Sequence, residues 1–138
     1  MQIKEIMAAD VKICSASASV TAAAQRMREE DIGDVVVLDD EGGLTGILTD
    51  RDIVVRVIAE ERDPHSVSVG SACSSDVVTL SPEQDVEEAA SIMRQHGVRR
   101  LPVVSDGEPV GMVSLGDLAI QRDSDSALAD ISAHPGNR

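Results

Sequence analysis

Two halves of the chain share one pattern of hydrophobic and polar positions, and the second copy begins about 66 residues after the first. Apolar residues at positions 20, 23, 24 and 27 have the i, i+3, i+4, i+7 spacing of an amphipathic helix, and positions 86, 89, 90 and 93 repeat it. Ser19 and Asp85, both good N-cap residues, precede these positions, and Glu88 follows Asp85 in a capping-box-like arrangement. The pattern predicts two helices, over residues 19–30 and 85–96.

Each predicted helix leads into two short apolar runs separated by a turn that carries Asp, Gly or Pro. The runs are continuous rather than alternating, which is typical of strands buried on both faces. They cover residues 35–38, 44–48, 101–104 and 110–113; further strands are expected at 11–14 and 77–80, and further helices at 50–60 and 115–122. We therefore predict an α+β fold of two β-α-β-β-α repeats, related by a pseudo-twofold axis and packed through their sheets.

The repeat also predicts the domain boundaries. Residues 1–62 form the first repeat and residues 63–122 the second, with a turn at Asp63 and Pro64 in the link between them. Residues 123–138 are rich in Ser and Asp and are expected to form a mostly mobile acidic tail, with a weak helix over 127–132.

Composition excludes several classes of function. The 138 residues carry 25 acidic and 12 basic side chains, a net charge of -13, and no Phe, Trp or Tyr. So acidic a chain is poorly suited to neutralising nucleic-acid phosphates, and without aromatic rings it cannot stack bases. No apolar stretch approaches the ~20 residues that cross a bilayer. We therefore expect neither a nucleic acid nor a membrane as a partner. Because 42% of the residues are hydrophobic and none is aromatic, we expect an aliphatic core.

The cysteines and histidines indicate neither a metal site nor an enzyme. Cys14, Cys73, His65 and His96 lack the close spacing of metal ligands, so we expect no bound metal. Neither cysteine has an evident basic setting that would activate it as a nucleophile, and we expect no catalytic residues. Two distant cysteines do not form the disulfide framework of a secreted domain, and no signal peptide is visible, which together predict a cytoplasmic protein.

A second shared motif lies where a strand runs into a helix. The sequence GILTDRD recurs as GMVSLGD, at residues 46–52 and 111–117. Backbone N–H groups at the helix start and the hydroxyl of Thr49 or Ser114 suit a phosphate, and the carboxylate of Asp52 or Asp117 suits the hydroxyls of a ribose. The same residues also form ordinary helix N-caps. Both interpretations stay open, because a capping hydroxyl can also contact a ligand.

These motifs resemble those of tandem cystathionine-β-synthase-type (CBS) domains, which as a pair are called a Bateman module. The resemblance runs from about residue 3 to residue 122 and rests on the A-A-x-x-M helices, on I-G-D-V-V-V and V-R-R-L-P-V before the strands, and on the two junction motifs. The chain is similar to small stand-alone bacterial CBS-pair proteins. The resemblance implies a regulatory ligand-sensing module rather than an enzyme. Such a module requires no cofactor but binds AMP, ADP, ATP or S-adenosylmethionine in clefts between the repeats.

The resemblance also assigns roles to residues. Asp52 and Asp117 match acids that bind ribose, and Thr49 and Ser114 match hydroxyls near the phosphates. Basic residues that contact phosphate are matched by Arg99 and Arg100, and Arg51 could supply similar charge in the first repeat. The positions expected beside the base are Val11, Ile13, Val77, Thr79 and Leu80. Without aromatic residues, the base would lie between aliphatic side chains.

The two clefts are expected to differ. Gly33 and Asp34 stand where the second repeat has Arg99 and Arg100, and Asp34 would repel a phosphate that it faced. We expect at most one cleft to bind a nucleotide well, and the net charge favours an AMP-like ligand over ATP. The alternative is a protein-interaction or stress-response module with empty, degenerate clefts and an unknown protein partner.

Residues 53–59 predict self-association. They fall in the helix predicted over residues 50–60 and make it apolar on nearly every side, and such a helix is usually buried. Its outer face would be exposed in a two-layer module unless another subunit covered it. We therefore expect a homodimer, which the resemblance also implies.

Overall fold

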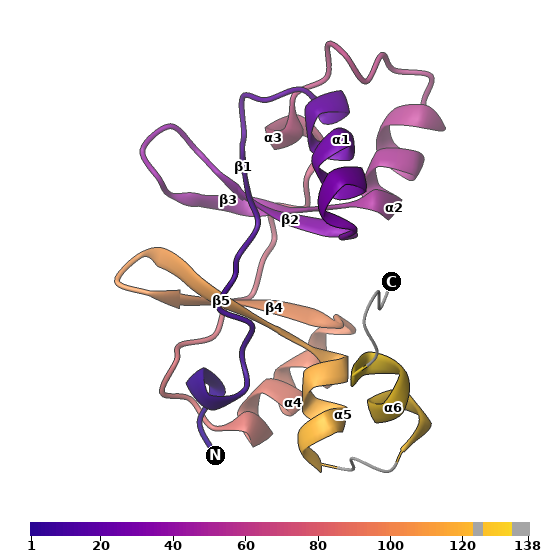
Figure 1. Cartoon of the computed structure of the whole chain (residues 1–138). Helices are drawn as coiled ribbons and strands as arrows, with labels where there is room; N and C mark the ends of the chain where they lie inside the picture. The colour runs from indigo at the N-terminus through magenta and orange to yellow at the C-terminus, as the bar shows by residue number, and fades with distance from the viewer. Residues whose placement is uncertain (123–125, 134–138) are drawn as a thin grey trace. The chain divides into compact units, whose positions relative to one another are not determined.

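The computed structural model describes residues 1–122 and 126–133, and its chain forms two compact units (Figure 1). One, here called the central unit, spans residues 12–77. The other, here called the flanking unit, combines residues 1–11 with residues 78–122 and 126–133. No helix among the described residues is long and apolar enough to cross a bilayer.

The central unit is built on a three-stranded sheet. Its strands are β1 (Ile13–Ser15), β2 (Asp34–Leu38) and β3 (Leu44–Thr49), with β1 parallel and β3 antiparallel to the central β2. Its helical elements are α1 (Val20–Glu30), α2 (Asp50–Ile53), the π-helical turn η2 (Val54–Ile58) and α3 (Val69–Ala72). Three consecutive valines of β2 are at most 1% exposed, which confirms that this strand is buried on both faces.

The flanking unit repeats this arrangement with a two-stranded sheet. Strands β4 (Arg100–Ser105) and β5 (Glu108–Ser114) pair antiparallel, and Leu80 adds a single parallel bridge to Val103. The helical elements are η1 (Ile3–Glu5), α4 (Val86–His96), α5 (Leu115–Arg122) and α6 (Ala127–Ala133). The strand expected at residues 77–80 is thus reduced to that one bridge, and the strand expected at 11–14 begins at Ile13.

Each compact unit takes one segment from the other repeat of the sequence. Ala8 bridges Met112 at the edge of β5, and Ser74 bridges Ile47 of β3 in the same way. The N-terminal segment therefore completes the second repeat, while residues 63–77 complete the first. The division at residue 62 remains a prediction about the linear repeat, and the compact units do not follow it.

The helix ends agree with the predicted caps in most respects. The N–H of Ala22 donates to the Ser19 hydroxyl and that of Glu87 to the Asp85 carboxylate, as expected for N-caps. The carboxylate of Glu88 accepts a hydrogen bond from the Gln84 side chain.

The helix expected over residues 50–60 is α-helical only in its first turn and continues as η2. Its run of β-branched residues lowers the α-helical propensity of this segment.

The weak helix expected near the C-terminus is present as α6. Ala129 on its inner face is 2% exposed, so this part of the predicted tail is folded against the flanking unit. The remainder of the predicted mobile tail, residues 123–125 and 134–138, lies outside the described residues.

Candidate functional site

The first strand-to-helix junction joins β3 to α2 through a reciprocal capping box. The N–H of Asp52 donates to the Thr49 hydroxyl at 3.0 Å, and the N–H of Thr49 donates to Oδ2 of Asp52 at 3.0 Å. Asp52 is 8% exposed, which makes it the one buried charged side chain among the described residues. Local backbone hydrogen bonding therefore accounts for one oxygen of this carboxylate.

The second junction, from β5 to α5, has the same geometry. The N–H of Asp117 donates to the Ser114 hydroxyl at 3.1 Å, and the N–H of Ser114 donates to Oδ2 of Asp117 at 2.8 Å. The capping interpretation is thus confirmed at both junctions. It leaves Oδ1 of Asp117, which accepts no hydrogen bond within the described part of the chain and could accept one from a ligand hydroxyl.

Residues at the start of β2 and β4 lie beside the junctions. Arg100 is directly opposite Ser114 in the strand pair, and the carbonyl of Arg99 accepts the N–H of Leu115 at 2.8 Å. Both arginines are exposed. The sequence motif therefore brings two cations to the second junction, where an anion would be stabilised.

The first junction has the opposite charge at these positions. Asp34 lies opposite Thr49, and the carbonyl of Gly33 accepts the N–H of Asp50 at 2.9 Å. Arg51 is exposed on the first turn of α2. The chemical difference expected between the repeats thus falls at matching places of the two folds.

Sequence reasoning missed one residue at the first junction. The Nε atom of Arg56 lies 3.8 Å from Oδ1 of Asp52, and its guanidinium also donates to the carbonyl of Cys73 at 3.1 Å. The signal available was the i, i+4 spacing of Asp52 and Arg56 on one helix face. Arg56 therefore pairs with the buried carboxylate and ties this helix to the segment after α3.

The five positions expected beside a base are divided between the units. Ile13 and Val77 belong to the central unit and are half-buried. Val11, Thr79 and Leu80 belong to the flanking unit. Leu80 is 2% exposed and packs in that unit's hydrophobic core.

The two cysteines lie in one hydrophobic cluster of the central unit. Burial raises the pKa of both the Cys14 and Cys73 thiols above the ordinary value of a cysteine. Reactive cysteines have a lowered pKa, so this environment does not favour a nucleophilic role for either thiol. The described residues also contain no group of three or more side chains positioned to hold a metal ion.

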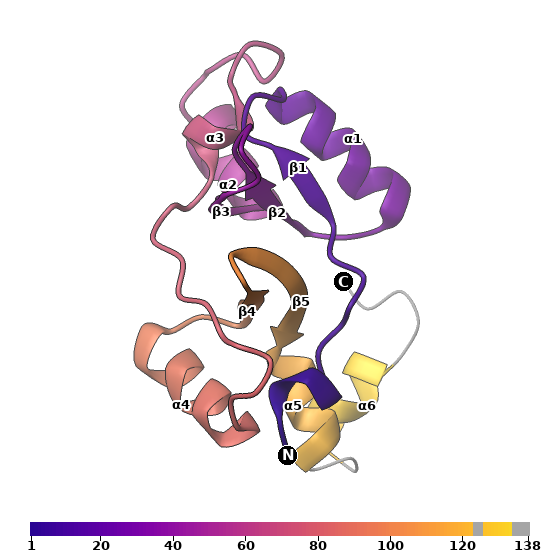
Figure 2. The same ribbon diagram turned by 90° about the vertical axis from the view of Figure 1, so that its left-hand side faces the viewer.

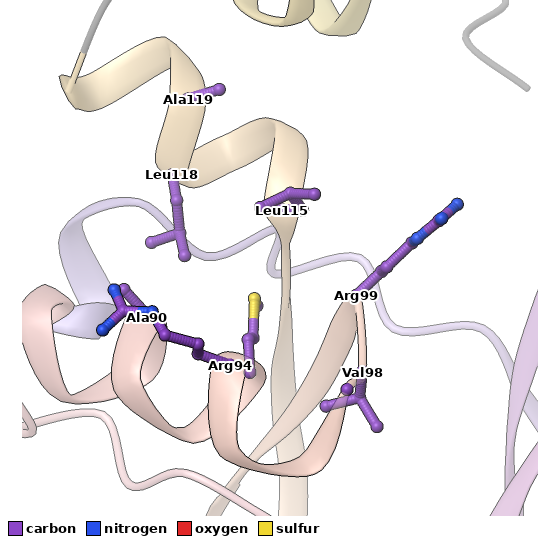
Figure 3. Close-up of a pocket in the computed structure, with 9 residues that line it drawn as sticks. Ala90, Arg94, Val98, Arg99, Leu115, Leu118 and Ala119 are labelled. Carbon is purple, nitrogen blue, oxygen red and sulfur yellow. The ribbon is translucent and has the colours of Figure 1, made fainter.

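A groove of about 520 Å³ lies between α4 and α5 in the flanking unit (Figure 3). Leu118 of α5 points toward Ala90 and the extended Arg94 side chain of α4, while the side chain of Arg99 points away. Its lining is completed by Met93, Gly97, Val98, Leu115 and Ala119. The groove therefore lies next to the second junction and combines aliphatic side chains with the guanidinium of Arg94.

Comparison with known proteins agrees with this organisation. The family model described as "CBS domain" matches residues 3–59 and 69–121. A CBS domain-containing protein of Bacillus subtilis, YhcV, is 37% identical over 134 residues, which cover 94% of each chain. Hypoxic response protein 1 of Mycobacterium tuberculosis is 37% identical over 116 residues, covering 84% of this chain and 81% of that protein.

Solved structures share the fold. Hypoxic Response Protein I, crystallised with two coordinated zinc ions, has a TM-score of 0.79 at 36% identity, covering 86% of this chain and 97% of that one. A CBS domain pair in complex with 5'-methylthioadenosine and S-adenosyl-L-methionine has a TM-score of 0.80 at 22% identity, covering 91% and 98% of the two chains. At that identity the second likeness concerns the fold. The α+β fold of two repeats is confirmed.

Proposed function

Because the chain belongs to the CBS-domain family and carries two copies of the domain in tandem, we propose that it is a regulatory module that senses an adenosyl nucleotide. The observation that carries this proposal is the pair of matching junctions, each with a hydroxyl and a carboxylate three residues apart. A CBS pair of the same fold has been crystallised with two adenosyl compounds, which supports the ligand class.

The second junction is the better nucleotide site of the two. Ser114 offers a hydroxyl to a phosphate, and Oδ1 of Asp117 can accept a ribose hydroxyl. Arg99 and Arg100 add positive charge there, whereas Asp34 adds negative charge at the first junction. The net charge of -13 opposes each further phosphate, so the preferred ligand is AMP-like rather than ATP.

Titration calorimetry and thermal unfolding with AMP, ATP and S-adenosylmethionine test this proposal. An AMP concentration a hundredfold above Kd should stabilise the fold by roughly 2.7 kcal/mol. Asp117→Asn keeps an oxygen for the Ser114 N–H but removes the charge, so it should weaken AMP binding about tenfold or more. The matched variant Asp52→Asn should stay within about twofold of the wild type.

Two results would contradict the proposal. The absence of any heat of binding or thermal shift with all three ligands at millimolar concentration would show that the protein does not sense an adenosyl nucleotide. Two AMP sites of equal affinity per chain would contradict the claim that the second junction binds the nucleotide better than the first.

The second candidate function is a protein-interaction or stress-response module whose nucleotide sites are empty. Asp34 favours it, because this carboxylate lies opposite Thr49 where the second repeat has Arg100. A protein partner whose affinity is the same with and without AMP would distinguish this function from nucleotide sensing.

Self-association is part of the proposed function. Val54, Val55 and Ile58 are 57%, 42% and 53% exposed, while Val57 of the same turn is fully buried. An exposed cluster of large aliphatic side chains is typical of an interaction surface. We propose that a second copy of the chain covers these three side chains in a homodimer.

A further inference from the structure

The C-terminal helix α6 packs along α5, and Figures 1 and 2 show the two helices side by side from both directions. Its first turn is capped by Ser126, whose hydroxyl accepts the N–H of Ala129 at 3.0 Å. A helix of seven residues is marginal by itself in water, so its contacts with α5 hold it in place.

The contact falls on the second junction. A methyl group added at Gly116 would lie 2.4 Å from Oγ and 2.7 Å from Cβ of Ser132, and 3.6 Å from Oγ of Ser114. Ser132 thus occupies the space over Gly116, which directly precedes Asp117. Only a glycine at position 116 allows so close an approach. The first junction has the exposed Arg51 at the matching position.

The docking is weakly held. Ala129 is the one fully buried apolar residue of α6, and its large apolar side chains, Leu128 and Ile131, are 44% and 63% exposed. Few buried apolar contacts mean that a segment opens at low cost in free energy. This helix can therefore leave α5 without unfolding the rest of the unit.

We propose that α6 is an autoinhibitory strap, which in its docked position covers the outer side of the second junction and competes with an adenosyl ligand there. The inference rests on the proposed nucleotide function of Ser114 and Asp117. A ligand that binds only when the strap is released has its affinity reduced by the released fraction. By linkage, the same ligand weakens the docking of α6 by an equal factor.

Two variants of the full chain test the strap by calorimetry with AMP. Ala129→Glu places a charge on the buried face of α6 and should release it, so AMP should bind about tenfold or more tightly than to the wild type. The matched control Ala127→Glu places the same charge on the exposed face of the helix and should leave the affinity within about twofold. An Ala129→Glu affinity equal to that of the wild type would overturn the strap.

A second variant and a second measurement cover the case in which Ala129→Glu does not fold. Ser132→Leu is too large for the gap over Gly116 and should give the same gain in affinity. In the wild type, saturating AMP should speed hydrogen exchange of the amides of residues 129–133, and unchanged exchange would count against the strap. Absence of AMP binding in the wild type and in all variants would overturn the proposed function itself, whereas equal binding in all of them would overturn the strap alone.

Discussion

The carbonyl oxygen of Ser74 lies so close to Gly46 that a methyl group added to the glycine would be 2.2 Å from it. That carbonyl accepts the N–H of Ile47 at 3.1 Å, and the N–H of Ser74 donates back to the Ile47 carbonyl at 2.9 Å. The backbone of Ser74 is therefore fixed against β3. In the flanking unit, a methyl group at Gly111 would lie 2.5 Å from Sδ and 2.9 Å from Cγ of the Met7 side chain, while the nearest backbone atom, the Ala8 carbonyl oxygen, is 3.2 Å away.

Gly46→Ala should destabilise the protein more than Gly111→Ala. The first substitution forces two hydrogen-bonded backbone segments apart, and we expect a loss of about 2–3 kcal/mol in the free energy of unfolding. The second requires mainly a new rotamer for Met7 and should cost about 1 kcal/mol. Urea denaturation of the two variants measures both values, and equal losses would contradict this account of the Gly46 contact.

The fold was predictable because its signals are local. The helix spacing around Met27 and Met93 and the continuous valines of β2 each determine an element within a few residues. Which unit a short segment joins is not a local property. Residues 3–5 and 69–72 are too short to show a helical period, and nothing in their pattern shows that each completes the other repeat's unit.

The candidate site was predictable to a similar degree. Thr49 and Asp52 lie three residues apart at a strand end, a spacing that by itself indicates a capping box. Arg56 follows Asp52 by four residues, but their contact also depends on the change from α2 to the π-helical turn η2, which the sequence pattern does not show. Leu80 was expected beside a base, but its depth of burial follows from tertiary packing that sequence alone does not give.

Thr49→Ala should lower the free energy of unfolding by about 1 kcal/mol, because it removes the hydroxyl that accepts the Asp52 N–H. Thr49→Ser keeps that oxygen and should recover most of the loss. Denaturant titrations of the two variants without any ligand isolate the capping contribution. If the serine variant is as unstable as the alanine variant, the hydroxyl is not the stabilising group.

Both thiols should react slowly in the folded protein. Burial raises the pKa of Cys14 and Cys73, so little thiolate is present at neutral or mildly alkaline pH. Labelling with a thiol reagent should therefore be slower in the native state than in urea, and equal rates would contradict the buried environment.

Glu30 should contribute to stability at neutral pH and lose its contribution in acid. The Arg26 side chain donates to this carboxylate at 2.7 Å and the Lys12 ammonium lies 3.1 Å away, and together they lower the pKa of Glu30 from its ordinary value. A carboxyl group with a lowered pKa in the folded state stabilises the protein above its unfolded pKa and ceases to do so as the pH falls through the folded value.

Glu30→Gln should accordingly lower Tm at neutral pH, and the difference from the wild type should shrink below about pH 4. Glu29→Gln is the control, since its carboxylate lies 4.0 Å from Arg28 on an exposed surface and contributes little. A Tm difference for Glu30→Gln that does not change with pH would show that its carboxylate charge is not the cause.

The exposed aliphatic side chains of η2 give the last prediction, which concerns the homodimer. Ile58→Asp places a charge among Val54 and Val55, so burying this surface against a second copy would cost the desolvation of a carboxylate. We expect sedimentation equilibrium to show twice the 14.5 kDa chain mass for the wild type and a shift toward the monomer for the variant. Because Ile58 is 53% exposed, the monomer of the variant should keep its cooperative unfolding. Ile131→Asp, which introduces the same charge at an exposed position on α6, should leave the dimer intact. A wild-type mass near that of one chain would refute the dimer, and an unchanged dimer in Ile58→Asp would place the interface on another surface.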